Sequence, residues 1–374
     1  MLEERAFWLA WSQIPGIGPV LLGRLQQHFG SLAEAWQVSS AQLQEVEGIG
    51  SQIVQKVVQE RSRQHPAQLL EQHQQKNPNF WTPADADYPR LLLEIPIFPP
   101  VLYYQGEVQP QLNIGIPPVV GIVGTREPSE YGKRWTRKVS STLAKKGFTI
   151  VSGMALGIDT EAHRGCLDGG GRTVAVLGTG VDVVYPLRNL SLYKEIQQDG
   201  LVVSEYPAGT SPDRTHFPRR NRIIAGLSRA VLVMEAPIKS GALITANFAN
   251  EFCRDVYALP GSLDNPGAHG CLELLNKGAH LILNEGLLLE MLGAIPPLDS
   301  AEQSGMFSAT PTAPLPDLPP EVKQVYEAIA SEPTTIDAIV QQAGLGAGSV
   351  SAALLQLELL GLVSQLPGMR YQRC

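Results

Sequence analysis

The sequence predicts an α/β protein with an open parallel sheet in its central region and a smaller domain at each end. Three observations lead to this prediction. Short apolar segments alternate with helix-length segments between about residues 119 and 292, as is typical of right-handed βαβ units. Two similar glycine-containing turns divide a helical N-terminal region, and a proline-rich segment precedes a C-terminal region. A chain of 374 residues is long enough for two or three domains.

The composition is that of a globular protein. Hydrophobic residues make up 44% of the chain and charged residues 17%. No apolar run reaches the roughly 18 residues of a membrane helix. The N-terminal sequence MLEERAFWLAW does not have the basic and then apolar segments of a signal peptide. We therefore predict a cytoplasmic protein without membrane contact.

The four cysteines predict neither a zinc site nor a disulfide framework. Cys166, Cys253, Cys271 and Cys374 are not spaced as CxxC, and no histidine pairs with them in the sequence. We expect them to be buried as small apolar side chains.

Residues 1–75 are predicted to form a helical domain of the helix-hairpin-helix or SAM-like kind. The turns 14-IPGIGP-19 and 46-VEGIGS-51 are each followed by an amphipathic segment. In a helix-hairpin-helix, such glycines let backbone N–H groups approach a DNA phosphate. A helical domain whose turns only pack remains an open alternative, because few cations (Arg24, Lys56 and Arg61) lie near the turns.

Residues 80–295 are predicted to form the α/β domain. Several of its segments are apolar throughout, as expected of strands buried on both faces of a parallel sheet. The predicted strands are residues 119–123, 148–152, 173–178, 201–205, 230–235, 255–260 and 279–284. Ligands of such sheets bind at the carboxyl ends of the strands, so the loops there form the candidate site.

Residues 296–317 are predicted to be a linker, and residues 318–374 a winged-helix-like domain. The linker is rich in Pro, Ser, Ala and Thr. Three helical segments and a hairpin-like end follow it, which is the element order of a winged helix. The third helical segment, which would read DNA in such a fold, contains no Lys or Arg. A role in protein interaction or packing is therefore favoured over DNA reading.

The net charge of −7 conceals a basic central segment. Residues 121–230 contain 16 Lys and Arg against 10 Asp and Glu, a local balance of +6. The rest of the chain has 13 basic and 26 acidic residues. Because a local basic surface decides anion binding more than the whole-chain charge does, we expect an anion to bind in this segment.

The strand-end loops of the basic segment contain glycines, hydroxyls and arginines suited to phosphate. Glycines permit close backbone approach, and arginines bind phosphate through two parallel hydrogen bonds. The G-x-G-x-x-G fingerprint and the P-loop pattern are both absent, so neither a dinucleotide nor ATP is predicted, and no cofactor is expected. The candidate residues in these loops are Gly124, Thr125, Arg126, Ser152, Gly153, Arg188, Asn189, Ser240 and Gly241.

The densest basic cluster lies in the stretch HFPRRNR. It contains Phe217, Arg219, Arg220, Asn221 and Arg222. An aromatic ring among arginines suits single-stranded nucleic acid, because the cations follow the phosphates while the ring stacks on a base. Arg222 precedes the apolar run IIAGL and is the arginine most expected to be structural.

Acidic residues near these loops leave an enzymatic interpretation open. A cluster in GIDTEAH suits a general base or a metal site; it consists of Asp159, Glu161 and His163, but no second motif completes a metal set. Hydrogen bonds to loops around a helix start are favoured for Asp159 and His163. Glu205 and Glu235 each end a strand, and we expect them to pair with the arginine cluster rather than act as acid or base.

Together, these motifs resemble those of the DNA-processing protein family DprA, also called Smf. The motifs are GTREPSEYG, SGMALGIDTEAH, AVLGTGVDVVYP, FPRRNRIIAGLS, SGALITA and ALPG, and they lie within about residues 80–290. The resemblance implies an extended Rossmann-like domain that binds single-stranded DNA and forms a homodimer. It also implies that the protein protects incoming single strands and helps to load the RecA recombinase in natural transformation, without catalytic activity.

The resemblance assigns roles to particular residues. Arg126 matches the arginine of the family's G-[ST]-R motif, which contacts DNA phosphate, and Ser152-Gly153 matches the turn beside it. The F-P-x-R-N-R motif matches if Arg220 is the arginine before the asparagine, which leaves Arg219 at the variable position. Family members often have a lysine beside the YPxxN segment, and here YPLRN offers Arg188, displaced by one position.

Two other classes of function remain open. Rossmann-like relatives include nucleotide phosphoribohydrolases, in which Asp159, Glu205 or Glu235 would be catalytic. The other class is an adaptor that binds only proteins, through its terminal domains.

Overall fold

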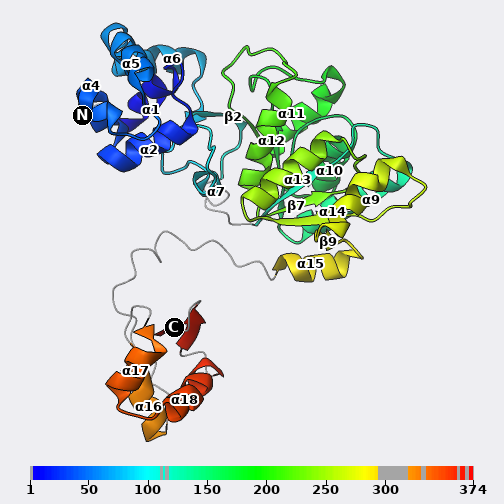
Figure 1. Cartoon of the computed structure of the whole chain (residues 1–374). Helices are drawn as coiled ribbons and strands as arrows, with labels where there is room; N and C mark the ends of the chain where they lie inside the picture. Colours follow the sequence, from blue (N-terminus) through cyan, green and yellow to red (C-terminus); the bar gives the residue numbers. More distant parts are fainter. Residues whose placement is uncertain are drawn as a thin grey trace. The chain divides into compact units, whose positions relative to one another are not determined.

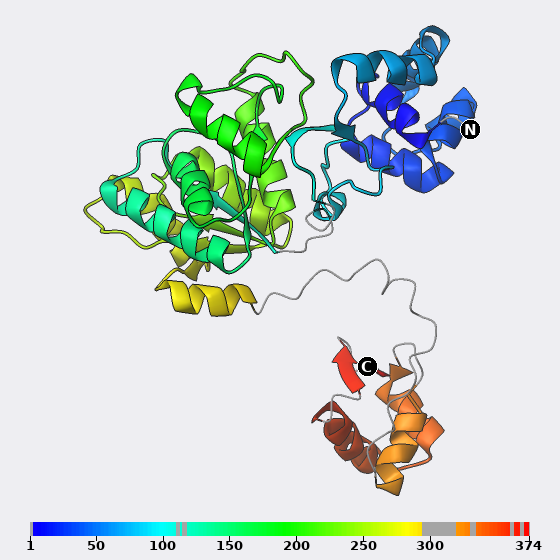
Figure 2. The same ribbon diagram turned by 180° about the vertical axis from the view of Figure 1, so that it is seen from behind.

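The computed structural model describes residues 3–109, 113, 118–293, 319–329, 334–359, 363–366 and 370–373. The chain forms two compact units, Met1–Leu298 and Asp299–Cys374. Figures 1 and 2 show that the first unit contains an N-terminal group of helices and an α/β region. The predicted linker at residues 296–317 lies outside the described residues.

The N-terminal helices form around the two predicted turns. They are α1 (Glu4–Ser12), α2 (Pro19–Phe29), α3 (Leu32–Gln37), α4 (Ser40–Gln44), α5 (Ser51–Arg63) and α6 (Pro66–Lys76). Gly16 and Gly48 have φ angles of 96° and 91°, a backbone region that favours glycine. Helix α2 begins just after the first turn and α5 just after the second. Trp8, Trp11 and Trp36 are buried between these helices.

The central sheet has nine strands in the order β1-β2-β6-β5-β4-β3-β7-β8-β9. Strand β2 pairs antiparallel with both β1 and β6, and the other neighbours are parallel. All the predicted strands are present. The strands are β1 (Phe80–Trp81), β2 (Leu102–Gly106), β3 (Val119–Val123), β4 (Thr149–Ser152), β5 (Thr173–Leu177), β6 (Leu201–Ser204), β7 (Ala230–Val233), β8 (Asp255–Ala258) and β9 (His280–Leu281). The predicted fold class is confirmed.

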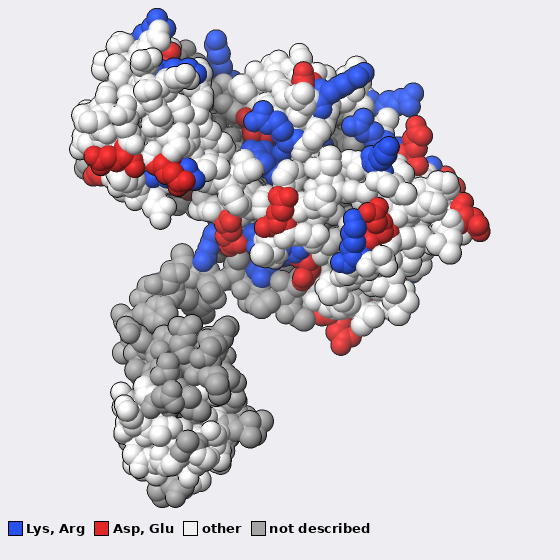
Figure 3. Space-filling model, viewed as in Figure 1, with Lys and Arg blue, Asp and Glu red and all other residues white. Residues whose placement is uncertain are grey.

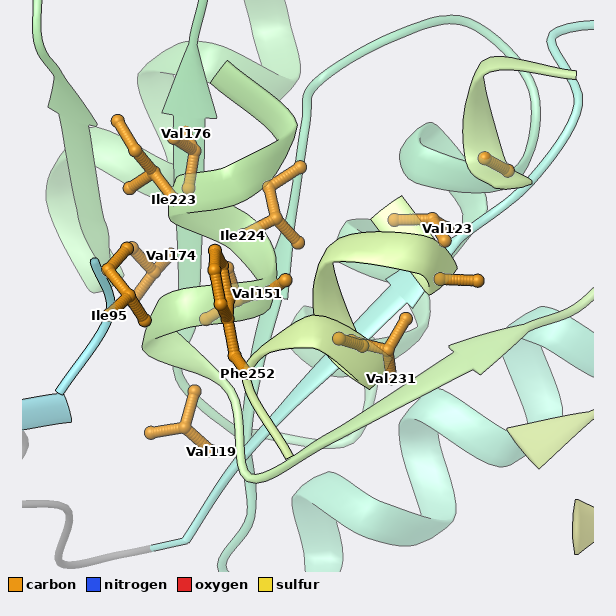
Figure 4. Close-up of a cluster of buried hydrophobic side chains, with 14 of the residues drawn as sticks. Ile95, Val119, Val123, Val151, Val174, Val176, Ile223, Ile224, Val231 and Phe252 are labelled. Atoms are coloured by element: carbon orange, nitrogen blue, oxygen red, sulfur yellow. The ribbon is translucent and has the colours of Figure 1, made fainter. Parts of the chain in front are cut away.

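Helices cover both faces of the sheet. One face packs against α9 (Glu130–Lys145), α10 (Ile158–Asp168), α11 (Leu190–Asp199) and α15 (Glu285–Gly293). The other packs against α7 (Arg90–Leu93), α12 (His216–Leu227), α13 (Gly241–Glu251) and α14 (His269–Asn276). In Figure 4, Val151 and Val174 of the strands lie beneath Ile223 and Ile224 of α12. Each such buried aliphatic side chain contributes about 1.5–3 kcal/mol, which fixes α12 firmly on the sheet.

The strand order determines where a ligand can bind. Strand β3 lies between β4 and β7. The chain leaves β3 through α9 on one face of the sheet and leaves β7 through α13 on the other face. Diverging connections open a crevice at the carboxyl ends of the strands. The turn that contains Arg126 follows β3 directly and therefore lies at this switch point.

The second unit has the element order expected of a winged helix. Its helices are α16 (Pro320–Glu327), α17 (Ile336–Ala343) and α18 (Ala347–Leu359). Strands β10 (Thr334–Thr335), β11 (Val363–Leu366) and β12 (Arg370–Arg373) pair antiparallel in the order β10-β12-β11. Apolar side chains from the three helices form the core of this unit.

The cysteine prediction is confirmed for two residues and wrong for one. Cys166 and Cys271 are buried free thiols. Cys253 is exposed, because it lies in a turn after α13 where its φ angle is 56° and its side chain is directed away from the core. Cys374 lies outside the described residues. Within the described part of the chain, no helix is both long and apolar enough to cross a membrane.

Candidate nucleic-acid interface

A cleft of about 710 Å³ lies at the switch point of the sheet. Its walls come from the turn after β3, the N-terminal halves of α12 and α13, and the loop after β5. The predicted residues that line it are Gly124, Thr125, Arg126, Phe217, Arg220, Asn221, Ser240 and Gly241. The fold therefore brings together segments that are more than 100 residues apart in the sequence.

The turn that presents Arg126 is held by backbone contacts. The N–H of Thr125 donates to the carbonyl oxygen of Glu235 at 2.7 Å, and the N–H of Ile158 donates to the carbonyl oxygen of Thr125 at 3.1 Å. A Cβ at Gly124 would lie 2.8 Å from the Glu235 carbonyl oxygen. Only glycine fits there, so the turn can pass close to the end of β7.

Arg126 is the most prominent cation of the cleft. Its side chain is exposed, and it forms no ion pair with any residue in the described ranges. The guanidinium carbon lies 5.7 Å from the centre of the Phe217 ring. The Tyr185 ring stacks on Phe217, with centroids 5.5 Å apart and planes at 29°. A cation beside two aromatic rings suits a nucleotide, which offers both a phosphate and a base.

Helix α13 presents its N-terminus to the cleft. Ser240 accepts a hydrogen bond from the N–H of Ala242 at 3.2 Å and so caps the helix. Asn221 of α12 donates to the Gly241 carbonyl oxygen at 3.1 Å, which fixes the distance between the two helices. The partial positive charge of a helix N-terminus favours an anion in the cleft.

Arg220 lies in the floor of the cleft and is 4% exposed. Its Nη1 donates to the Gly153 carbonyl oxygen at 2.7 Å and also to the Val176 carbonyl oxygen. Burial lowers its pKa to about 10, although the Asp159 carboxyl opposes that shift. A Cβ at Gly153 would lie 2.6 Å from Arg220 Nη2 and 2.7 Å from Asp159 Oδ2. Arg220 thus joins α12 to two strand ends and leaves a positive charge beneath the cleft.

Three further candidates are buried and bonded within the fold, and of these Asn189 also lines a second pocket. Arg222 is 5% exposed and forms a two-point ion pair with Glu205 at 2.7 and 2.8 Å, as expected of a structural arginine. Ser152 donates to the Ile122 carbonyl oxygen at 2.6 Å. Asn189 donates to the Met154 carbonyl oxygen at 2.9 Å. The sequence placed these residues in the right loops but did not reveal their orientation.

A second pocket of about 440 Å³ adjoins the cleft. Arg126 and Glu127 line both cavities. Gly157, Asn189 and the predicted Arg188 line the second pocket, together with two cations that were not predicted, Lys133 of α9 and Arg164 of α10. Both lie on helices near the switch point. They were counted in the charge balance of residues 121–230, but no sequence motif assigned them to the site. Figure 3 shows Lys and Arg side chains gathered over the region of α11 and α12.

Arg219 takes a different position from the other arginines of its cluster. Its side chain is exposed, but it lines neither the cleft nor the second pocket. Arg214, which lies five positions before Arg219 in the sequence, does line the cleft. Arg219 and Arg220 differ because consecutive residues of a helix point in different directions, whereas Arg214 lies in the loop before α12.

The three candidate acidic side chains, Asp159, Glu205 and Glu235, are engaged within the fold, whereas Glu127 is exposed and lines both cavities. Glu205 pairs with Arg222 as predicted. The same prediction is wrong for Glu235, which accepts hydrogen bonds from Ser129 and Asn265 instead. Asp159 is buried and accepts from the Ala155 N–H at 3.2 Å. Burial raises its pKa, and the Arg220 charge opposes that rise.

His163 is buried in the contact between α10 and the sheet rather than in a loop at a helix start. Its Nδ1 lies 2.7 Å from the hydroxyl of Thr173, and its buried Nε2 has no hydrogen-bond partner among the residues that the structure describes. Burial, with a smaller effect of Arg220, lowers its pKa to about 3. Among the described residues, no group of three or more His, Cys, Asp and Glu side chains is placed to hold a metal ion.

The fold and the cleft define a Rossmann-like α/β protein with a cleft lined by arginines at the switch point of its sheet, followed by a winged helix. Residues 79–293 match the family described as DNA recombination-mediator protein A, and residues 309–369 match the DprA winged helix domain. The chain therefore belongs to the DNA recombination-mediator protein A family, also called DprA or Smf.

Relatives with similar sequences extend over most or all of the chain. Protein Smf of Synechocystis sp. is 55% identical over 99% of this chain and 99% of its own length. Protein Smf of Escherichia coli is 38% identical over 76% of this chain and 75% of its own length.

Two solved structures share the fold. The structure of DNA processing protein A from Streptococcus pneumoniae matches with a TM-score of 0.66 and 34% identity, covering 78% of this chain and 98% of that one. DNA processing protein A from Helicobacter pylori, whose structure is described as giving insight into its single-stranded DNA binding mode, matches with a TM-score of 0.52. That match has 33% identity and covers 57% of this chain and 95% of the other.

Proposed function

We propose that this chain binds single-stranded DNA along a track formed by the cleft and the second pocket. The observation that carries the proposal is the position of Arg126. Its exposed guanidinium lines both cavities and has no carboxylate partner among the described residues. A phosphate of a continuous strand would supply the missing counter-charge, and the neighbouring phosphates would approach Arg188, Lys133 or Arg164 in the second pocket.

The cleft favours unpaired bases over duplex. The stacked rings of Tyr185 and Phe217 lie in its wall. A base can reach those rings only if it is free to turn out of a helix, which is the case for a single strand. The single-stranded DNA binding described for the Helicobacter pylori relative agrees with this proposal.

The arrangement of the carboxylates favours binding over hydrolysis. A nucleotide hydrolase needs a carboxylate that can reach the substrate. Of the three candidate catalytic carboxylates, Glu205 is held by Arg222 and Glu235 by Ser129 and Asn265. Asp159 lines the cleft but is 6% exposed and accepts from the Ala155 N–H. Glu127, which was not a candidate, is the exposed carboxylate of the lining. We therefore propose a binding protein without catalytic activity.

The cellular role that we propose follows from the family. Its members are described as recombination mediators, and we infer that this chain protects incoming single strands in the cytoplasm and loads the RecA recombinase on them during natural transformation. We also propose a homodimer through the α/β region. Strand β9 is the edge of the sheet, and Leu281 and Leu283 are 43% and 63% exposed there; a second copy would cover such an edge.

The proposed DNA site is tested by replacing Arg126 with alanine. We expect single-stranded DNA to bind about 10- to 100-fold more weakly, because a hydrogen bond to a charged group contributes about 1.5–3 kcal/mol. The slope of log K against log salt should also fall by about 0.7 for each lost phosphate contact. Fluorescence anisotropy with labelled oligonucleotides across a salt series measures both quantities.

The matched control for this test is Arg134→Ala. Arg134 is an exposed arginine of α9 that lines neither the cleft nor the second pocket, so its loss should change binding by less than about twofold. Equal effects of the two substitutions would move the DNA site away from the switch point. Preferential binding of duplex by the wild type would point to the N-terminal turns instead.

A further inference from the structure

Glu235 is a buried carboxylate that has no charged partner within the described part of the chain. It follows β7, is 4% exposed, and forms no ion pair with any residue that the structure describes. Its hydrogen-bond donors are neutral groups of Ser129 and Asn265. Burying a carboxylate in this way is costly unless every acceptor is satisfied, so its position calls for a functional explanation.

The carboxylate fills the N-terminal end of α9. Oε2 accepts from the Ser129 N–H at 3.0 Å and from the Ser129 hydroxyl at 2.8 Å, and Ser129 is the N-cap of the helix. A Cβ at Gly132 would collide with Oε2, and a Cβ at Gly267 would lie 2.8 Å from Oε1. In Rossmann-type folds, the helix after the first strand commonly places its N-terminus against a phosphate. Here a side chain of the protein takes that place.

Glu235 also holds both ends of the turn that presents Arg126. Its carbonyl oxygen accepts from the Thr125 N–H at 2.7 Å, and its carboxylate accepts from Ser129. Only residues 126–128 lie between these two attachments. The turn therefore cannot move without breaking a buried hydrogen bond, and the direction of Arg126 is fixed before any ligand arrives.

We propose that Glu235 is a positioning residue of the anion cleft: its carboxylate occupies the N-terminus of α9 and holds the 125–129 turn so that Arg126 faces a phosphodiester. This inference rests on the proposed DNA binding of the same cleft. It gives Glu235 a role without contact to DNA, and it explains why a negative charge lies so near an anion site. A held side chain binds more tightly because less conformational entropy is lost on binding.

The test is a double-mutant cycle with Glu235→Ala and Arg126→Ala, measured as single-stranded DNA affinity across a salt series. We expect Glu235→Ala to weaken binding about tenfold and to lower the salt slope as Arg126→Ala does. If Glu235 acts through Arg126, the double variant binds within about twofold of Arg126→Ala alone. A double variant that is weaker by the full product of the two single effects would overturn the inference.

Two further variants separate positioning from general loosening. Glu235→Gln keeps an oxygen that can accept from Ser129, so we expect it to bind DNA more tightly than Glu235→Ala, and an equal loss in both would contradict the proposed contact. Asn265→Ala removes the partner of Oε1 but leaves the 125–129 turn attached, so affinity should stay within about twofold of the wild type. A loss as large as that of Glu235→Ala would also overturn the inference.

The same experiment distinguishes failure of the inference from failure of the proposed function. If the wild type does not bind single-stranded DNA at low salt, the proposed function itself is wrong. If the wild type binds but the effects are additive, only the role of Glu235 is wrong. Thermal melting shows whether each variant is folded, and Ser129→Ala, which keeps the carboxylate but removes one of its donors, replaces Glu235→Ala in the cycle if that variant does not fold.

Discussion

At the scale of single residues, the arginines in and around the cleft differ in whether their side chains already have hydrogen-bond partners in the protein. Arg126 is exposed and unpaired among the described residues, whereas Arg220 and Arg222 are buried and bonded to carbonyl or carboxylate oxygens. An exposed cation loses little when it exchanges water for a phosphate, while a buried one is already engaged. We therefore propose Arg126 as the direct phosphate contact, while the buried pair shapes the surface around it.

The buried His163 makes a prediction about pH at this scale. Its pKa of about 3 in the folded protein lies below the ordinary value of 6.5. Between these two pH values, His163 is protonated in the unfolded chain but neutral in the folded protein. The contribution of His163 to the free energy of unfolding is therefore complete above about pH 6.5 and is lost as the pH falls toward 3. We expect urea denaturation to show a decline on the order of 4 kcal/mol from this group, which His163→Asn should lack. An equal acid sensitivity of wild type and variant would contradict this, and replacement of the exposed His65 serves as the control.

At the scale of elements, helix α12 combines anchoring and binding. Arg220 and Arg222 fix it to strand ends and to Glu205, and Ile223 and Ile224 fix it to the sheet. Phe217, in its first turn, projects beside Arg126. A helix held so rigidly can present an aromatic ring with little loss of entropy on binding.

The aromatic ring can be tested separately from the charges. We expect Phe217→Ala to weaken single-stranded DNA binding by about 1–3 kcal/mol, the range for one stacked base, and to leave the salt slope unchanged because no phosphate contact is lost. Phe217→Tyr keeps a ring and should bind nearly as the wild type does. A change of slope in the alanine variant would show that Phe217 acts by orienting Arg126 and not by stacking.

At the scale of the whole molecule, the edge strand β9 predicts the oligomeric state. It pairs with β8 on one side only, and its neighbour Leu283 is exposed. We expect Leu283→Glu to convert the proposed homodimer to a monomer in size-exclusion chromatography with light scattering. The melting temperature should change little, because an exposed position contributes little to the monomer's stability. A wild type that is already monomeric at micromolar concentration would rule out the dimer. If the dimer forms, it brings two clefts together and raises the effective affinity for a long strand.

The sequence by itself determined the main elements and the position of the Arg126 turn at the carboxyl edge of the sheet. Strands β3 to β8 were predictable because uninterrupted apolar runs are stable only where both faces of a sheet are covered. The turn around Arg126 was predictable because a glycine-rich strand end in such a sheet lies where ligands bind. The pairing of Arg222 with Glu205 was also expected, since a buried arginine needs a carboxylate.

Only the tertiary structure decided which groups face the ligand and which face the protein. Ser152, Asn189 and Arg220 are buried and donate to backbone carbonyl oxygens of distant segments, although Arg220 also lines the cleft and Asn189 the second pocket. Their neighbours in sequence do not determine these contacts. Lys133 and Arg164 reach the second pocket because α9 and α10 pack side by side. The carboxylate of Glu235 accepts a hydrogen bond from Ser129, which lies 106 positions away in the sequence. Local patterns report propensity and burial, whereas hydrogen bonds between remote segments exist only once the chain has folded.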